Sequence, residues 1–202
     1  PFIVAVADCT GHGVPGAMLS LLVSNSLDRI YATDTAQDPA EALLGLDRFV
    51  RLGLNQDRAD SESNDGCDAA ILRIDTQRQT VEYAGAKIGL FHVSNKGVCT
   101  RYSPAKCSLG YRELVNESEA PKVTTIAYEP GDTFSLVTDG VTDQPGGSAG
   151  KVAYGYRRLE AVLVDNHLKN ATDILEAIKD SHEQWQGKNA RRDDLTVLIF
   201  KF

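Results

Sequence analysis

The order of the expected elements is the feature that most constrains the fold. An apolar strand opens the chain, two helices follow, short alternating strands fill the middle, and two more helices precede a final strand. Strands that follow one another without a helix between them favour antiparallel pairing, because a parallel pair needs a long crossover connection. We therefore predict an α+β fold with antiparallel sheets, and not a doubly wound parallel sheet.

Hydrophobic periodicity and turn residues give the expected boundaries. Apolar residues recur at helical spacing between Val14 and about Tyr31, and Asn95-Lys96-Gly97 is typical of a hairpin turn. The expected strands are 2–7, 69–75, 80–84, 88–94, 98–102, 123–128, 133–138 and 195–202. The expected helices are 14–31, 39–54, 156–165 and 171–185, with loops at 55–64 and 146–150.

Composition excludes several classes of protein. The net charge of −7 argues against a general nucleic-acid binder, which needs a basic face. No stretch approaches the roughly 18 apolar residues that span a bilayer. The four cysteines form no C-x-x-C pair, which argues against a zinc site and favours reduced thiols in a cytosolic domain. The chain starts at Pro1 without a basic leader, which predicts a fragment of a longer protein and not a signal peptide.

Acidic residues lie where apolar strands meet loops. Asp8 follows the first strand, Asp139 follows the strand at 133–138, and Asp193-Asp194 precedes the last strand. A single aspartate in such a place often caps a turn. If the strand ends meet at one edge, however, the carboxylates gather there and raise one another's pKa unless a cation is bound. Oxygen ligands select Mg²⁺ or Mn²⁺, and two such ions roughly 4 Å apart can activate water and clamp a phosphoryl group.

Six segments in order resemble the motifs of one family, the bacterial SpoIIE-type branch of the PP2C (PPM) phosphatases. They are VADCTGHGVPGAML, DGCDAAILRID, VEYAGA, PGDTFSLVTDGVTDQPGG, YGYRRL and RRDDLTVLIFKF. Each motif is weak alone, but together they run from Val6 to Phe202. The resemblance implies one PP2C-like domain over 1–202, an αββα sandwich of two antiparallel sheets flanked by helices. It also implies two Mg²⁺ or Mn²⁺ ions at one end.

The resemblance also implies roles for single residues. Asp8 is similar to the aspartate that bridges both metals, and the Cys9 backbone carbonyl takes the place of the usual glycine carbonyl. Asp139, in T-D-G, resembles a second ligand. Asp193 resembles the last ligand, and Asp194 is the second choice because relatives often carry asparagine there.

The sequence departs from the family pattern in two ways. The acidic motif that normally precedes Asp8 is absent because the chain begins too late. His12 does not fall on the general-acid position of the eukaryotic branch, so its role as a general acid is a hypothesis beside that of a hydrogen-bonded loop histidine. Asp68 and Asp143 either support the site or cap turns. The conformational glycines near the site are predicted to be Gly11, Gly13, Gly85 and Gly140.

The implied function is metal-dependent hydrolysis of phosphoserine or phosphothreonine on a small regulatory protein, such as an anti-sigma-factor antagonist in a partner-switching system. A metal-activated water would be the attacking group. The implied parent carries a sensor, HAMP or receiver region upstream. This domain would be cytoplasmic and without nucleic-acid or membrane contacts, with anchoring of the parent in the inner membrane and homodimerisation left open.

Two alternatives differ from this function. An aspartyl-phosphate phosphatase of the haloacid-dehalogenase kind needs D-x-D-x-T after its first strand, but here Cys9-Thr10 follows Asp8, so the second aspartate is missing. A catalytically inactive PP2C-fold module that acts as a binding switch stays open, because the upstream motif is absent. With either function, Arg191 and Arg192 have two possible roles. They either attract a phosphoprotein or form a solvated pair on the surface.

Overall fold

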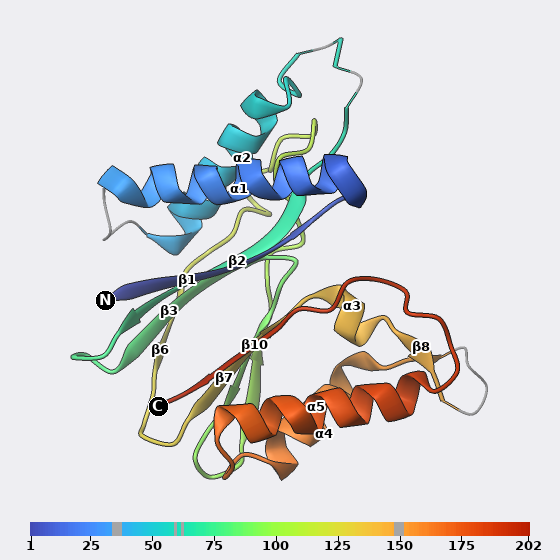
Figure 1. The fold of residues 1–202 in the computed structure, drawn as a ribbon. Coiled ribbons are helices and arrows are strands. Elements are labelled where there is room, and N and C mark those ends of the chain that lie inside the picture. The colour runs from blue at the N-terminus through green and yellow to red at the C-terminus, as the bar shows by residue number, and fades with distance from the viewer. Residues whose placement is uncertain (34–37, 59, 62, 148–151) are drawn as a thin grey trace. The chain divides into compact units, whose positions relative to one another are not determined.

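The chain divides into two compact units. The computed structural model describes residues 1–33, 38–58, 60, 61, 63–147 and 152–202 (Figure 1). Unit 1 comprises Pro1–Ile88 and Ser103–Ala127, and unit 2 comprises Gly89–Tyr102 and Tyr128–Phe202. Each unit contains one four-stranded sheet in which all neighbouring strands are antiparallel.

In unit 1 two helices cover one face of the sheet (Figure 1). The Asp38 carboxylate begins the second helix by accepting hydrogen bonds from the backbone N–H groups of Ala40 (2.8 Å) and Glu41 (3.2 Å). Leu43 and Leu46 from that helix are fully buried with Ile71 from the sheet. The strands, in sheet order, are β1 (Phe2–Cys9), β2 (Cys67–Asp75), β3 (Thr80–Ala86) and β6 (Thr124–Ala127), and the helices are α1 (Gly13–Thr33) and α2 (Pro39–Gly53).

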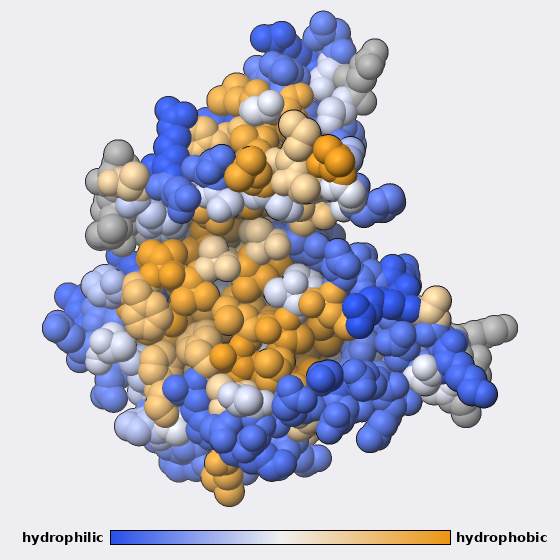
Figure 2. Space-filling view, viewed as in Figure 1, coloured by the Kyte–Doolittle hydropathy of each residue, from blue (hydrophilic) through white to orange (hydrophobic). Residues whose placement is uncertain are grey.

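Helix α1 has a buried and an exposed apolar stripe. Leu19, Val23 and Ile30 pack into the core of unit 1, as their helical spacing predicts. On the other side Val14, Met18 and Leu21 are 73%, 68% and 62% exposed. Figure 2 shows apolar side chains gathered along this part of unit 1. Among the described residues, no helix combines the length and apolar character needed to cross a bilayer.

Unit 2 repeats the arrangement of a sheet with helices on one face (Figure 1). Phe91 from the sheet is buried with Leu159 and Ile174 from the helices. The strands, in sheet order, are β10 (Val197–Lys201), β7 (Thr133–Val137), β4 (Leu90–Val93) and β5 (Cys99–Tyr102), and the long helices are α4 (Gly155–Asp165) and α5 (Ala171–Gln186). The short elements are α3 (Asp139–Thr142), β8 (Pro145–Gly146) and β9 (Val152–Ala153).

The predicted antiparallel α+β arrangement is confirmed, and the four long helices lie within two residues of their predicted bounds. The predicted end of the first strand is wrong. β1 continues through Asp8 to Cys9, because β2 begins at Cys67 and provides pairing partners that far. The expected loop at 146–150 starts inside β8, and residues 148–150 lie outside the described residues.

A buried carboxylate joins two turns of unit 2. Asp132 is 4% exposed and accepts hydrogen bonds from the His92 ring (2.8 Å) and the backbone N–H groups of Asn95 (2.8 Å) and Glu129 (3.1 Å). The His92 ring also stacks on Phe134. Burial raises the pKa of Asp132, but these hydrogen bonds outweigh it, so the net pKa lies below the ordinary aspartate value.

We predict that Asp132→Ala lowers the free energy of unfolding at pH 7 by about 2–3 kcal/mol, because it leaves buried donors unpaired. The folded-state pKa of Asp132 is depressed, so its contribution is present above the unfolded pKa of about 3.9 and is lost as the pH falls through the folded pKa. The difference between the variant and the parent, measured by urea unfolding, should therefore shrink below about pH 4. Asp180→Ala, on the exposed surface of α5, is the matched control and should change stability by less than about 0.5 kcal/mol.

Candidate metal centre

Two carboxylates lie opposite each other where β1 ends and β2 begins. Asp8 is the register partner of Asp68, and Cys9 is the partner of Cys67. Directly opposite residues of an antiparallel pair share a face, and successive residues alternate between faces. The two cysteines pack against the core that α1 and α2 cover, so Asp8 and Asp68 lie on the opposite face of the sheet. Asp68 is thus a strand residue beside the candidate ligand, which favours the alternative that it supports the site over the alternative that it caps a turn.

A third carboxylate supports this edge of unit 1. Asp65 accepts hydrogen bonds from the hydroxyls of Thr10 (3.3 Å) and Ser63 (2.8 Å). The Thr10 hydroxyl also accepts a hydrogen bond from the Gly66 backbone N–H (3.1 Å). The turn after Asp8 is therefore tied to the segment that leads into β2. The D-G-C-D motif contained the signal for Asp65, which the sequence reasoning did not use.

A buried glutamine fixes the same segment. The Gln56 side-chain amide donates to the Asp65 carbonyl (2.7 Å) and accepts from the Asp65 N–H (2.7 Å). It also donates to the Gly110 carbonyl, and the Gly110 N–H donates to the Asp47 carboxylate (2.8 Å). Gln56 is almost fully buried, so its hydrogen bonds are made where water does not compete. Gln56 thus fixes Asp65 through the backbone groups of Asp65, and the Asp65 carboxylate stays at the edge of the sheet.

The turn between β1 and α1 needs glycine. Gly11 and Gly13 have φ of +83° and +67°, in the left-handed region that favours glycine, as predicted for both. His12 lies exposed between them, and the described residues provide no hydrogen-bond partner for its ring. Among the described residues nothing favours one of the two roles of His12 over the other, and the general-acid role stays a prediction.

In unit 2 a second group of carboxylates forms around α3. Asp139 begins α3 directly after β7, and Asp143 follows its last residue. Partial desolvation contributes most to a raised pKa of Asp139, followed by the negative charges of Asp143 and Asp193. The Gly140 backbone and the Arg192 charge oppose this rise only in part. In unit 2 the segment of Asp193 thus lies beside Asp139, and the role of both as metal ligands stays a prediction.

The close approach of two backbone segments explains why the two aspartates meet. Gly140 packs so tightly on the segment 193–194 that a Cβ atom there would overlap the carbonyl oxygen of Asp194. The Asp194 N–H donates to the Asp193 carboxylate (2.8 Å). Nearby, the Thr138 N–H donates to the Thr196 carbonyl and the Thr196 N–H donates to the Thr138 hydroxyl, both at 3.1 Å. These bonds hold the approach to β10 against the end of β7.

Unit 2 also fixes its acidic segment with a buried glutamine. The Gln144 side chain donates to the Ala190 carbonyl (2.9 Å) and accepts from the Arg192 N–H (3.1 Å). Gln144 lies two residues after the end of α3, so one side chain couples the end of that helix to the segment that contains Asp193. Arg191 and Arg192 are both exposed.

The cysteine pair in unit 1 has its own electrostatics. A hydrogen bond from the Cys67 thiol lowers the pKa of Cys9 to about 7. The same hydrogen bond, together with burial, raises the pKa of Cys67. All four cysteines of the chain are free thiols.

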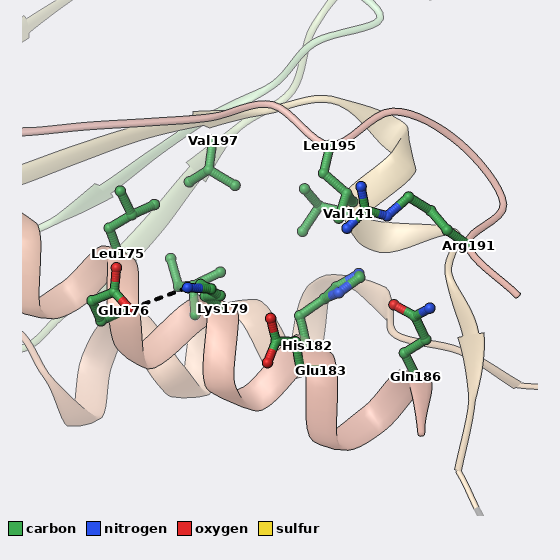
Figure 3. Close-up of a pocket in the computed structure, with 11 residues that line it drawn as sticks. Val141, Leu175, Glu176, Lys179, His182, Glu183, Gln186, Arg191, Leu195 and Val197 are labelled. Carbon is green, nitrogen blue, oxygen red and sulfur yellow. Dashed lines mark ion pairs between the residues drawn. The ribbon is translucent and has the colours of Figure 1, made fainter. Parts of the chain in front are cut away.

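A cavity of about 370 Å³ adjoins α3 on the side of α5 (Figure 3). Val141 and Leu195 give it apolar walls, and the buried His182 projects toward it from α5. Burial lowers the pKa of His182, which favours its neutral form. The charged groups at the margin of the cavity include an ion pair between Lys179 Nζ and Glu176 Oε2 (3.6 Å). Because opposite charges balance here, the carboxylate group around α3 and not this cavity suits a cation.

The donors at both acidic edges suit hard cations. They are carboxylate and carbonyl oxygens, which Mg²⁺ and Mn²⁺ prefer. Partial desolvation raises the pKa of Asp139 most, and the charges of Asp143 and Asp193 raise it further, a contribution that a bound cation would oppose. Within either unit, the described residues gather no group of three or more His, Cys, Asp and Glu side chains placed to hold a metal ion. Asp8 and Cys9 belong to unit 1, so their convergence with Asp139 and Asp193 stays a prediction.

Comparison with known families decides the classification. The model of the family described as Stage II sporulation protein E (SpoIIE) matches residues 1–202. The chain belongs to the SpoIIE family. No curated protein matches it. The predicted SpoIIE-type resemblance is therefore confirmed over the whole chain.

Solved structures confirm the PP2C-like fold. The SiaA-PP2C domain of Pseudomonas aeruginosa is 31% identical with a TM-score of 0.85, and the match covers 99% of this chain and 75% of that one. The PP2C phosphatase domain of SpoIIE from Bacillus subtilis, with a fragment of its regulatory domain, is 15% identical with a TM-score of 0.73, covering 99% and 54%. RsbX in complex with magnesium is 21% identical with a TM-score of 0.63, covering 98% and 79%. This SpoIIE-family chain thus has the fold of PP2C-type serine/threonine phosphatases, and the haloacid-dehalogenase alternative has no support.

We predict that Gly140→Ala lowers the free energy of unfolding by about 1–3 kcal/mol, because the added methyl group has to push away the backbone of Asp194. Urea unfolding measures this change. Gly45→Ala is the matched control, since a Cβ there meets only the Ile30 side chain at ordinary contact distance (3.4 Å) inside helix α2. It should be neutral or stabilising by up to about 1 kcal/mol. Equal stability of Gly140→Ala and the parent would show that the two segments can separate freely.

Proposed function

We propose that this SpoIIE-family domain is a metal-dependent protein phosphatase that hydrolyses phosphoserine or phosphothreonine on a small regulatory protein. The observation that carries the proposal is the group of carboxylates around Asp139, whose pKa is raised by partial desolvation, Asp143 and Asp193. Carboxylates with raised pKa values that lie close together are common at functional sites. Membership of the SpoIIE family and the PP2C-type fold support the reaction class.

Two Mg²⁺ or Mn²⁺ ions are the proposed cofactors. The ligands would be the carboxylates of Asp8, Asp139 and Asp193 and the backbone carbonyl of Cys9, with Asp194 as the second choice for the last carboxylate. The similar protein RsbX has been solved in complex with magnesium, which supports a hard cation here. When bound, such ions supply an activated water molecule and neutralise charge on a phosphoryl group.

The other residues of the two edges would position the proposed ligands, adjust the charge around them and supply a proton. Asp68 and Asp65 add negative charge beside Asp8, and their segment is fixed by Gln56. Arg192 already offsets part of the charge around Asp139, and it would attract a phosphoprotein to that edge. His12, exposed on the turn after β1, would donate its ring proton to the leaving oxygen of serine or threonine.

The proposed substrate is a small regulator of the anti-sigma-factor-antagonist kind, as in partner switching, and this part rests on the family resemblance alone. The second candidate is a PP2C-fold module without turnover that acts as a binding switch. The two differ in one measurable property, which is hydrolysis in the presence of metal. We also propose, from the resemblance alone, that a longer parent protein has a sensor, HAMP or receiver region upstream of this domain.

We predict that the protein hydrolyses p-nitrophenyl phosphate and a phosphoserine peptide only when Mn²⁺ or Mg²⁺ is added. Asp8→Ala or Asp139→Ala should lower kcat/KM at least about 10³-fold, or about 4 kcal/mol, because each removes a ligand. Both variants should keep the parent's circular dichroism spectrum, because the loss of one carboxylate relieves repulsion. Asp28→Ala on α1 and Asp180→Ala on α5 are the surface controls and should keep full activity. Turnover retained in Asp8→Ala or Asp139→Ala would refute the ligand assignment, whereas Mn²⁺ binding without turnover in the parent would favour the binding switch.

His12→Ala provides a separate test of the general acid. The leaving serine oxygen needs a proton, but p-nitrophenolate is a stable anion and does not. We therefore expect about a 10²-fold loss of kcat with the phosphoserine peptide and little change with p-nitrophenyl phosphate. Equal losses with both substrates would point to a role in binding or folding instead.

A further inference from the structure

The geometry points to a redox modification site formed by Cys9 and Cys67. We propose that a hydroperoxide converts the two thiols to a disulfide, and that the disulfide weakens metal binding at the edge that contains Asp8. The first part stands on the geometry of the pair alone. The second part rests on the proposed function, because it takes the Asp8 carboxylate and the Cys9 carbonyl as ligands.

The register of β1 and β2 places the two thiols side by side. Cys9 is the last residue of β1, Cys67 is the first residue of β2, and the two are direct partners. The next pair is a hydrogen-bonded one, because the Thr10 N–H donates to the Gly66 carbonyl (2.9 Å). Hydrogen-bonded and non-hydrogen-bonded pairs alternate along an antiparallel ladder. Cys9 and Cys67 therefore form a non-hydrogen-bonded pair.

The backbone of Cys67 supports this assignment. Its N–H donates to the Leu109 carbonyl (2.9 Å), and its carbonyl accepts from the Leu109 N–H (2.8 Å), so both groups point away from β1. In a non-hydrogen-bonded pair the Cα atoms are about 4.5 Å apart, which lies within the roughly 4.4–6.8 Å that a disulfide spans. The two side chains share a face, because the residues are direct register partners. Closure therefore needs little movement of the chain.

The two thiols differ in access, which sets the order of the chemistry. Cys9 is half-buried, whereas Cys67 is 1% exposed. A hydroperoxide would thus meet Cys9 first: the sulfur attacks the terminal peroxide oxygen, the O–O bond breaks, and water or an alcohol leaves. The Cys67 sulfur then attacks the sulfur of this sulfenic acid, the S–O bond breaks, and a second molecule of water leaves. The two thiols lose two electrons and two protons in total, and the peroxide gains them.

The disulfide would change the edge that precedes the turn. Opposite Cβ atoms of a strand pair are about 4.5–5.5 Å apart, whereas those of a disulfide are near 3.8 Å. Closure therefore draws the end of β1 toward β2 and shifts the Cys9 peptide, which contains the proposed carbonyl ligand and adjoins Asp8. Changes in groups that support a metal ligand typically cost about 10- to 100-fold in metal affinity.

The test begins with the thiols and needs no turnover. The reduced protein is treated with hydrogen peroxide, alkylated with N-ethylmaleimide and mapped by mass spectrometry. We expect a cross-linked peptide that contains Cys9 and Cys67, alkylation of Cys99 and Cys107, and reversal by dithiothreitol. Cys107→Ala removes another partly buried thiol of unit 1 and should form the cross-link as the parent does. A sulfinic acid at Cys9 without a cross-link, or thiols that all remain open to alkylation, would overturn the proposal.

The second measurement is Mn²⁺ affinity by calorimetry in both redox forms. The oxidised parent should bind at least about tenfold more weakly than the reduced parent. Cys67→Ala should bind Mn²⁺ as the reduced parent does and should be insensitive to peroxide, with Cys67→Ser as the second variant if the alanine form does not fold. Equal affinities in the two forms would overturn the link to the metal. If the reduced protein itself neither binds Mn²⁺ nor hydrolyses substrate, the proposed function fails, while the mapping still decides whether the redox pair exists.

Discussion

Repulsion among carboxylates is the constraint on which the two candidate edges depend. Negative charges that lie close together repel one another, so the backbone has to hold their segments in place. Each unit does this with a buried glutamine that binds main-chain groups of an acidic segment. Gln56 holds the segment of Asp65, and Gln144 holds the segment that leads to Asp193. A neutral amide suits this task because it both donates and accepts without adding charge.

The two-residue period of a strand gives β1 two separate roles. Asp8 lies on the face away from α1 and α2, and Cys9 lies on the face that these helices cover. A one-residue slip of register would exchange the carboxylate with the thiol and bury a charge in the core. The pairing of β1 with β2 therefore fixes the candidate ligand and the thiol pair together. A change in the thiol pair that moves the end of β1 therefore also moves the candidate ligand Asp8, and the reverse holds as well.

The sequence was sufficient for elements with long, regular patterns. Helices α1, α2, α4 and α5 were predicted within two residues, because their periodicity and caps are local signals. The short elements α3, β8 and β9 were missed, since a few residues carry no period and are stabilised by contacts from afar, such as Trp185 packing against Gly146 and Gly147. The upstream bound of β2 was also two residues late, and this error hid the pairing of Asp68 with Asp8.

The candidate site was predictable only where the motifs named its residues. The motifs singled out Asp139 and Asp193, and in unit 2 the two residues lie near each other. Asp65, Gln56 and Gln144 were missed, because their roles come from hydrogen bonds to residues that are close in space and not from any local pattern. The position of Asp8 relative to the other two aspartates remains a prediction from the resemblance.

The opposite pKa shifts of Asp132 and Asp139 separate a structural carboxylate from a candidate functional one. Both residues lie at the ends of β7 and both lose some solvent, which alone would raise the pKa of each. Asp132 is surrounded by N–H donors, so its charge is satisfied and its pKa falls. For Asp139, partial desolvation and then the charges of Asp143 and Asp193 raise the pKa, and the Gly140 backbone and Arg192 offset this rise only in part. The negative charge that remains around Asp139 is what a bound cation would offset in the proposed site.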